Sequence, residues 1–407
     1  MSDFHQHGTI ATLHNLSQRP LEDLETQLLE FSQSRKMGLI LPSLYSEIGT
    51  NALDKIVSEL ARVEYLDTVV VGIDRASSDQ FKHAVQFFKP LPQEVCLLWQ
   101  DGPRLRELDT LLKDERLAPY QEGKGRNVWY CMGYLLSQAR VDCVALHDCD
   151  IVTYSRELLA RLLFPVANPI FSYAFCKGYY ARTTQTKMNG RANRLLVTPL
   201  LRALEIVCGP SDYLKFLDSF RYALAGEFSM QLDVLKTLKI PSDWGLEIGL
   251  LSEMHRNYSS NRICQVDIAN HYDHKHQDLG DEEAAHGLAR MATDIAKALY
   301  RKLATQGEVF TQEKIRTIKA TYYRVALDFV GMYHNDALIN GLTYDRHSEE
   351  KTVELFAQNV MQAGWDFLEY PMAQPFVPAW NRVISAMPDI LPRLAEAVAQ
   401  DAEEFAA

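Results

Sequence analysis

The chain of 407 residues contains no Cys-x-x-Cys pair and no apolar run long enough to cross a bilayer. Its cysteines are scattered, mostly within apolar stretches, at Cys96, Cys131, Cys143, Cys149, Cys176, Cys208 and Cys264. This distribution argues against a disulfide framework or a zinc site. The first residues also lack the basic start and apolar core of a signal peptide. We therefore expect a reduced, cytoplasmic protein without membrane contact.

Basic residues are fewer than acidic residues. The chain has 42 Lys and Arg against 53 Asp and Glu, which gives a formal net charge of −11. A general nucleic-acid-binding surface needs an excess of basic side chains, so no nucleic-acid partner is expected. A small anionic substrate needs only a local basic pocket, which this charge balance allows.

Two common nucleotide-binding motifs are missing as well. No Gly-x-Gly-x-x-Gly follows the first predicted strand, and the chain has no Gly-x-x-x-x-Gly-Lys-Ser/Thr. These absences argue against a dinucleotide-dependent dehydrogenase and against a P-loop NTPase.

Short apolar stretches alternate with segments of helical periodicity through the first 282 residues. This alternation predicts an α/β fold with a mainly parallel sheet covered by helices on both faces. The predicted strands are 38–44, 67–74, 95–99, 143–146, one within 168–183, and 263–268. The predicted helices are 21–31, 52–61, 81–88, 103–115 and 126–140.

The character of the sequence changes after residue 282. Long helical patterns follow, interrupted by a proline-containing stretch that we expect to be a loop; the patterns are 283–305, 311–332, 348–363 and 389–405. We predict three regions along the chain. They are an N-terminal helical segment (1–37), a catalytic α/β domain (38–282) and a helical C-terminal extension (283–407).

Asp148 and Asp150 form the only Asp-x-Asp pair and directly follow the apolar strand 143–146. Side chains two positions apart on a strand point to the same side. Two converging carboxylates suit Mg²⁺ or Mn²⁺ when waters and phosphate oxygens complete the coordination. The alternative is a solvated turn after the strand.

Other polar residues follow the ends of neighbouring predicted strands. In parallel sheets ligands bind beyond the carboxyl ends of the strands, so we expect one shared crevice. It would bring together 42–47, 74–79, Lys124 and the acidic pair. Lys124 lies between two glycines before a predicted helix, where a phosphate would meet both the cation and the helix N-terminus. A flexible loop with an exposed lysine is the alternative.

Two further clusters carry candidate ligands. Lys187, Arg191 and Arg194 form a local basic group, and guanidinium forks match phosphate or carboxylate oxygens. The alternative is a solvated helix start. Three histidines within 271–276 favour a metal or phosphate site, against a chance grouping in a polar loop.

Taken together, these motifs resemble those of the glucosyl-3-phosphoglycerate synthases, retaining glycosyltransferases with the GT-A fold. The matching segments follow the family's order over roughly 38–280. They are Pro42–Leu44, Gly123–Gly125, Asp148–Asp150, Gly190–Asn193, Leu224–Glu227, Gly245–Leu251 and His274.

The resemblance implies a Rossmann-like GT-A domain with a nucleotide-binding half at about 38–152 and an acceptor half at about 153–282. It implies UDP-glucose as donor, 3-phosphoglycerate as acceptor and Mg²⁺ or Mn²⁺ as cofactor. The implied donor-binding residues are Pro42, Ser43, Leu44, Glu47, Asp74, Lys124, Asp148, Gly226 and Lys275. The implied acceptor-binding residues are Gly190, Arg191, Asn193 and His276.

The resemblance further implies that Asp150 and His274 bind the metal, with Asp150, Glu247 and the backbone of Leu224 in catalytic positions. Glu247 would bind sugar hydroxyls rather than attack the sugar. The chain departs from the family at Asn193, where Thr is common, and at residues 274–276, where His-Arg-Asn is common.

Three alternatives remain at this point. One is a related GT-A transferase that uses GDP-mannose or GDP-glucose, or that accepts free glycerate. Another is a sugar-nucleotide pyrophosphorylase, although the chain lacks the usual glycine-rich, arginine-containing phosphate loop near the first strand. The last is a non-catalytic nucleotide-sugar binder. We expect a homodimer, from the resemblance and from the aromatic-rich C-terminal region.

Overall fold

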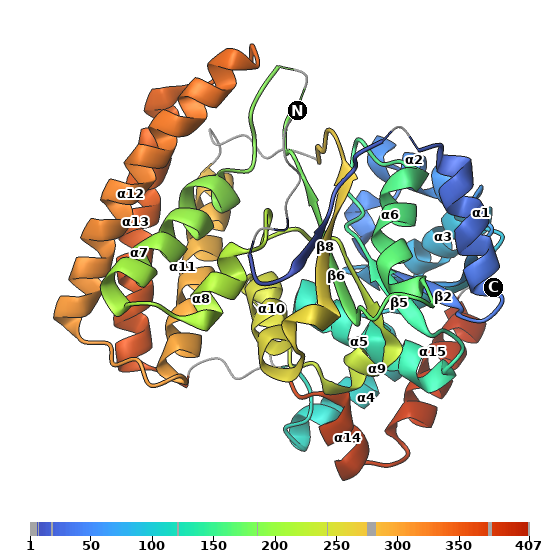
Figure 1. The fold of residues 1–407 in the computed structure, drawn as a ribbon. Helices are drawn as coiled ribbons and strands as arrows, with labels where there is room; N and C mark the ends of the chain where they lie inside the picture. The colour runs from blue at the N-terminus through green and yellow to red at the C-terminus, as the bar shows by residue number, and fades with distance from the viewer. Residues whose placement is uncertain are drawn as a thin grey trace.

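The structure is a computed structural model with one large mixed sheet at its centre (Figure 1). It describes residues 6, 8–17, 19–119, 122–184, 186–241, 243–274, 282–372 and 377–405, with backbone alone at 282–286. The strand order is β1-β8-β6-β7-β5-β2-β3-β4. Only β7 runs antiparallel to its neighbours in the described sheet.

All six predicted strands are confirmed. The strands are β1 (Ala11–Leu13), β2 (Met37–Leu44), β3 (Leu66–Asp74), β4 (Glu94–Trp99), β5 (Cys143–Leu146), β6 (Phe175–Tyr180), β7 (Phe228–Gln231) and β8 (Ile263–Ala269). The strand predicted within 168–183 is β6, which begins at Phe175; the preceding apolar residues lie in a loop where Ile170 is 88% exposed. Strands β1 and β7 were not predicted.

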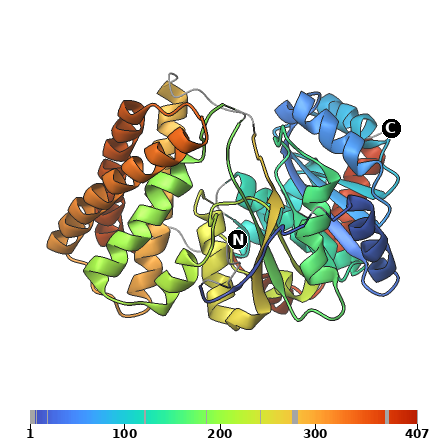
Figure 2. The ribbon, with the colours of Figure 1, turned by 45° about the horizontal axis from the view of Figure 1, so that its top comes forward.

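Helices cover both faces of the sheet and extend to one side of it (Figures 1 and 2). Before residue 282 they are α1 (Leu21–Ser32), α2 (Asn51–Leu60), α3 (Ser78–Phe88), α4 (Pro103–Asp114), α5 (Lys124–Gln138), α6 (Arg156–Ala167), α7 (Thr198–Cys208), α8 (Asp212–Asp218), α9 (Leu232–Thr237) and α10 (Leu246–Asn257). The later helices are α11 (Glu282–Ala304), α12 (Gln312–Ile339), α13 (Arg346–Glu369), α14 (Trp380–Ala386) and α15 (Ile390–Phe405).

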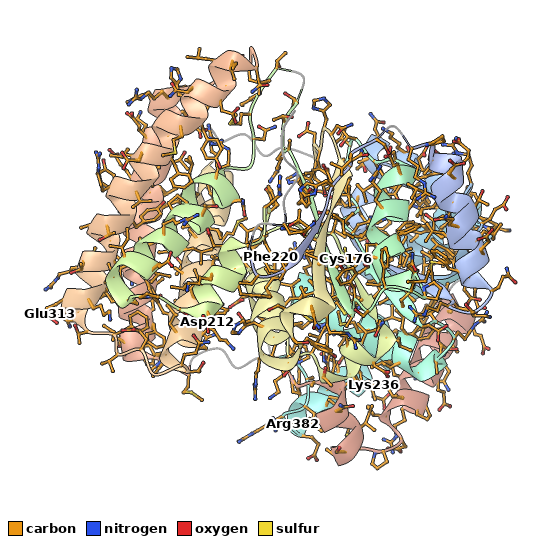
Figure 3. All side chains as sticks on the ribbon, in the orientation of Figure 1. Cys176, Asp212, Phe220, Lys236, Glu313 and Arg382 are labelled. Carbon is orange, nitrogen blue, oxygen red and sulfur yellow. The ribbon has the colours of Figure 1, made fainter. Side chains whose placement is uncertain are left out.

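The core forms on both faces because side chains alternate along each buried strand. In β2, Leu39 and Leu41 join the apolar cluster of α1, α2, α3 and α6, whereas Ile40 joins the cluster of α4, α5 and α10 on the other face. Cys176 on β6 is buried between these layers, while Glu313 and Arg382 point outward (Figure 3). Helix α3 is capped at its N-terminus, since the Ser77 hydroxyl accepts from the Gln80 N–H.

The helices after residue 282 divide between two sides of the molecule. Helix α13 packs on both α11 and α12, and α12 also packs on α7. Helix α15 returns to pack on α4 and α5 at the far end of the sheet (Figure 1). None of the helices in the described part of the chain is both long and apolar enough to span a membrane.

These elements confirm the predicted α/β class with a mainly parallel sheet, flanking helices and a helical C-terminal region. The predicted 1–37 segment contains α1 and also strand β1, which pairs with β8. Helix α14 lies within the stretch that we expected to be a loop. The boundaries between the three predicted regions stay a prediction.

Candidate active site at the carboxyl ends of the strands

Lys124 joins two acidic residues from separate parts of the chain. It is the first residue of α5, and its Nζ lies 2.6 Å from Oδ1 of Asp148 and 3.5 Å from Oε1 of Glu247. Burial opposes the charge on Lys124, but the two carboxylates outweigh it and raise the pKa of the ammonium group. Burial likewise opposes the charge on Asp148, and Lys124 outweighs it and lowers the pKa of that carboxyl. The side chains of Lys124 and Asp148 are 35% and 31% exposed, so the ion pair is accessible to a ligand.

Asp150 and His274 lie side by side although they are far apart in the sequence. A β-bridge between Ile151 and His274 brings the two loops together, and Nδ1 of His274 lies 3.7 Å from Oδ2 of Asp150. Arg182 Nη2 donates to His274 Nδ1 at 3.1 Å, which requires an unprotonated Nδ1. The histidine is therefore neutral in this arrangement, the form that binds metal ions.

The surroundings of the Asp150 carboxyl group make this position suitable for a cation. Burial, followed by the charge of Asp148, raises the pKa of Asp150 to about 7, with smaller contributions from Glu47 and Glu227. Its Oδ1 is buried and has no hydrogen-bond partner in the described part of the chain. The same holds for Oε2 of Glu47, on the turn after β2. A divalent cation would compensate these unpartnered carboxylate oxygens, so the residues present fit such an ion.

The backbone next to the acidic pair is fixed by a buried lysine. Lys177 on β6 is fully buried, and its Nζ donates to the carbonyl oxygen of Ala225. Burial lowers the pKa of Lys177 to about 8, opposed by Glu247 and Glu227. This contact holds the segment from Leu224 to Gly226 in place. Sequence analysis did not identify Lys177, because a single lysine within a strand carries no motif.

Glu227, which follows this segment, connects three elements of the site. It is fully buried and accepts hydrogen bonds from Tyr180 OH at 2.8 Å and from Tyr272 OH at 2.5 Å. The two tyrosine rings are stacked, with centroids 3.6 Å apart. Because Tyr272 lies two residues before His274, this network fixes the loop that presents the histidine. Glu227 lies within a segment quoted from the sequence, but it was not assigned a role.

The predicted nucleotide-binding residues lie along the ends of adjacent strands. Pro42, Ser43 and Leu44 at the end of β2 pair in register with the last residues of β3, where Leu44 is opposite Asp74. Asp74 is buried and accepts from the N–H of Arg75 at 3.0 Å. Burial, reinforced by the nearby charge of Asp101, raises the pKa of Asp74.

The predicted acceptor residues that the structure describes lie just before α7, away from the acidic pair in sequence. Gly190 has a φ of +76°, a conformation that favours glycine, and it precedes a π-helical turn at Ala192–Val197. Arg191 and Arg194 are both engaged by Glu349 of α13, so they do not form a solvated helix start. Asn193 is buried, with its Oδ1 unpartnered among the described residues.

Lys187 is more exposed than the two arginines. Its side chain is exposed, and its backbone forms a bridge with Thr343. Lys275 and His276, which we also predicted as ligands, lie outside the described residues.

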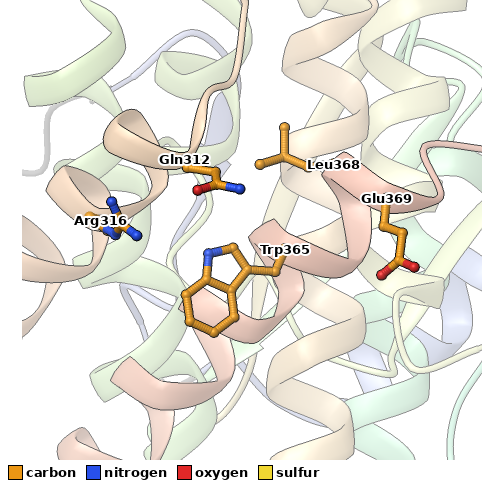
Figure 4. A pocket seen from close by; sticks show the side chains of 5 residues that line it. All are labelled: Gln312, Arg316, Trp365, Leu368 and Glu369. Atoms are coloured by element: carbon orange, nitrogen blue, oxygen red, sulfur yellow. The ribbon is translucent and has the colours of Figure 1, made fainter.

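A separate pocket of about 440 Å³ lies between α12 and α13 (Figure 4). Its lining residues are Gln312, Arg316, Trp365, Leu368 and Glu369. None of the predicted site residues lines it, so it is distinct from the candidate site at the strand ends.

Comparison with known proteins places the chain among sequences of the same length. No family model matches it. A glucosyl-3-phosphoglycerate synthase from Persephonella marina is 45% identical over 401 residues, which cover 98% of this chain and 99% of the relative. The glucosyl-3-phosphoglycerate synthase of Methanococcoides burtonii is 38% identical over 408 residues, 99% of each chain.

Solved structures show the same fold at lower identity. One is the Mycobacterium tuberculosis glucosyl-3-phosphoglycerate synthase in complex with Mn²⁺, UDP-glucose and phosphoglyceric acid. Its TM-score is 0.52 at 19% sequence identity, and the match covers 73% of this chain and 88% of that chain. Another is the mannosyl-3-phosphoglycerate synthase of Rubrobacter xylanophilus, with a TM-score of 0.53, 20% identity and coverage of 74% and 83%. These likenesses confirm the predicted GT-A fold. With two relatives above 30% identity over nearly their whole length, the chain belongs to the glucosyl-3-phosphoglycerate synthase family of glycosyltransferases.

Proposed function

We propose that this glycosyltransferase moves glucose from UDP-glucose to the 2-hydroxyl of 3-phosphoglycerate, with retention at the anomeric carbon and with a divalent cation. The observation that carries the proposal is the meeting of the Lys124–Asp148 ion pair with the Asp150–His274 pair at the carboxyl ends of the strands. This arrangement offers both a cation-binding position and a fixed positive charge to a diphosphate.

Asp150 and His274 would hold Mg²⁺ or Mn²⁺. The described residues contain no group of three His, Cys, Asp or Glu side chains arranged to hold a metal ion. Phosphate oxygens and water would therefore complete the coordination, as is usual for Mg²⁺. When bound, the cation would offset the negative charge that builds on the leaving diphosphate. The fold neighbour from M. tuberculosis binds Mn²⁺ together with UDP-glucose.

The donor would lie along the ends of β2 and β3 and reach the start of α5. Pro42–Leu44, Glu47 and Asp74 would contact the uridine, and Asp148 the ribose or the metal-bound waters. Lys124 is held charged by its two carboxylates, so it can stabilise the departing phosphate electrostatically. Lys275 is placed near the diphosphate by the family resemblance alone.

The glucosyl group would lie between Glu247 and the segment Leu224–Gly226. Glu247 contacts Lys124 at 3.5 Å, which suits a carboxylate that binds sugar hydroxyls. Lys177 fixes the carbonyl of Ala225 and so keeps this backbone close to the sugar. We infer attack of the acceptor hydroxyl on the same face that the diphosphate leaves, without a covalent sugar–enzyme intermediate.

The acceptor would bind at Gly190, Arg191 and Asn193, with His276 nearby. A guanidinium fork pairs well with the phosphate or carboxylate of a phosphorylated hydroxy acid. This contact would align the 2-hydroxyl for attack. A homodimer and a cytoplasmic location also stay predictions for this chain.

The second candidate is transfer from GDP-mannose to the same acceptor. It is favoured by the likeness of fold to a mannosyl-3-phosphoglycerate synthase. GDP-glucose as donor and free glycerate as acceptor belong to the same group of alternatives.

A matrix of donors and acceptors with nucleotide release as the readout tests the proposal. UDP-glucose, GDP-glucose and GDP-mannose are each combined with 3-phosphoglycerate, glycerate or no acceptor, in Mg²⁺, Mn²⁺ or EDTA. We expect UDP release only with UDP-glucose, 3-phosphoglycerate and a divalent ion together, and an α-linked product by proton NMR. Nucleotide release from GDP-mannose alone among the donors would support the second candidate instead.

A further inference from the structure

Helix α13 contributes a buried carboxylate to the predicted acceptor site. Glu349, in the first turn of this helix, is 3% exposed. Its Oε1 accepts from Arg191 Nε at 2.6 Å, and its Oε2 accepts from Arg194 Nη2 at 3.0 Å. One side chain from the C-terminal helical region therefore joins both arginines of the basic cluster.

Further contacts hold the same segment against α12 and α13. Ser348 Oγ accepts from Arg191 Nη2 at 3.2 Å, beside the contact with Glu349. The guanidinium of Arg194 lies 4.8 Å from the centroid of the Tyr333 ring. The Thr343 N–H donates to the carbonyl of Thr186 at 2.7 Å. The chain from Thr186 to Arg194 is thus fixed by residues of, or between, the two long helices.

The charges in this group leave Arg191 able to bind an anion. Two arginines and one carboxylate give a net charge of +1. Arg194, whose side chain is 9% exposed, offsets the buried carboxylate, whereas the side chain of Arg191 is 21% exposed. Glu349 and Ser348 use the Nε and Nη2 groups of Arg191, and a guanidinium carries five N–H donors in a rigid fork. The remaining donors are therefore held in one orientation.

We propose that Glu349 is a positioning residue for the acceptor, which orients Arg191 toward the phosphate or carboxylate of a phosphorylated hydroxy acid. This inference rests on the proposed function, because it takes Arg191 as an acceptor contact. It assigns a role to the C-terminal helical region, namely to form the rear wall of the acceptor site.

The test compares Glu349→Gln with the unaltered enzyme in steady-state kinetics. Glutamine keeps the shape of the side chain but removes its charge, so Arg191 loses its strongest anchor. We expect the KM for 3-phosphoglycerate to rise about tenfold, with kcat and the KM for UDP-glucose within about twofold of the unaltered enzyme. Calorimetric titration with 3-phosphoglycerate should show a matching loss of affinity. Arg191→Ala should raise the same KM further.

A matched control lies next to Glu349 on the same helix. Glu350 forms an exposed pair with Arg346 at 2.9 Å, so Glu350→Gln removes an equivalent charge without touching the cluster. It should leave both KM values unchanged. If Glu349→Gln does not fold, Ser348→Ala removes only the Nη2 contact and should raise the acceptor KM two- to threefold.

An unchanged or lowered acceptor KM in Glu349→Gln would overturn the inference, as would an equal rise in both KM values. Failure of the proposed function is a separate result, because it would appear as inactivity of the unaltered enzyme toward 3-phosphoglycerate. The variants would then be compared with the acceptor that the matrix selects, by the same criteria.

Discussion

A Cβ atom at Gly226 would lie 2.5 Å from Oδ2 of Asp148, closer than two non-bonded atoms can approach. The glycine therefore sets the distance between the backbone before β7 and the carboxylate that pairs with Lys124. Asp148 cannot move away freely, because its other oxygen is held by that lysine at 2.6 Å.

Gly226→Ala should displace this ion pair and lower kcat/KM for UDP release at least tenfold, since small displacements of catalytic groups cost about this much or more. Gly331→Ala is the matched control. A Cβ at Gly331, on α12, meets no atom within 4 Å, and alanine is favoured over glycine in helices. Equal activity of the two variants would show that a Cβ at position 226 does not displace Asp148.

Asp150→Asn should abolish turnover and weaken Mn²⁺ binding in the presence of UDP at least about a hundredfold, because it removes a direct ligand charge. His274→Ala should do the same. Mn²⁺ affinity can be followed by electron paramagnetic resonance, independently of activity. Asp114→Asn, at the exposed end of α4, should change neither quantity. Full activity of both site variants would refute the metal assignment.

Lys177→Met should lower kcat about tenfold or more by releasing the carbonyl of Ala225, while the acceptor KM changes little. Methionine fills much of the same space but cannot donate a hydrogen bond. The change separates positioning of the Leu224–Gly226 backbone from binding of the acceptor. A selective rise in acceptor KM would place Lys177 in a different role.

His147 should make stability depend on pH. Its Nδ1–H donates to the carbonyl of Asp148 at 2.9 Å, and burial lowers the pKa of the imidazole to about 4. The unfolded chain, with a pKa near 6.5, binds the proton more tightly. Stability is therefore lost as the pH falls from about 6.5 to 4, by about 3 kcal/mol for this group.

The His147→Asn variant lacks this group and keeps an N–H donor at the position of Nδ1. The free energy of unfolding, from urea titrations between pH 4 and 7, should fall less steeply for the variant than for the unaltered protein. Parallel curves over this range would mean that His147 is not the group responsible.

The parts of the fold that were predicted are those where the sequence carries long, regular patterns. Continuous apolar stretches such as Val69–Ile73 have few alternatives to a buried strand. Strands β1 and β7 are three and four residues long, too short to show a period, and β7 includes Ser229 and Gln231. The start of β6 within 168–183 could not be predicted, since no local pattern shows that Ile170 faces solvent.

Within the candidate site, too, the residues that could be predicted are those marked by a sequence pattern. Asp148 could be predicted because it follows β5 and parallel topology brings strand ends together. Lys124 could be predicted because it lies between two glycines at the start of a helix. Lys177 and Arg182 carry no motif, and Glu227 lies in a matching segment that suggested no role for it. The contacts of all three depend on which strands become neighbours. Glu349 was the least accessible to prediction, because it joins Arg191 across a separation of 158 residues.

The first N–H groups of helix α4 donate hydrogen bonds to a residue near the other end of the chain. The carboxylate of Asp401 on α15 accepts from the N–H groups of Arg104 and Leu105 at 3.1 and 3.2 Å, and Phe405 packs on Trp99 with ring centroids 5.3 Å apart. During translation, α4 must leave the ribosome with its N-terminal end uncapped. Its final stability is therefore reached only after α15 has been synthesised, and a nascent chain arrested before Ile390 offers an unfinished surface to chaperones and proteases.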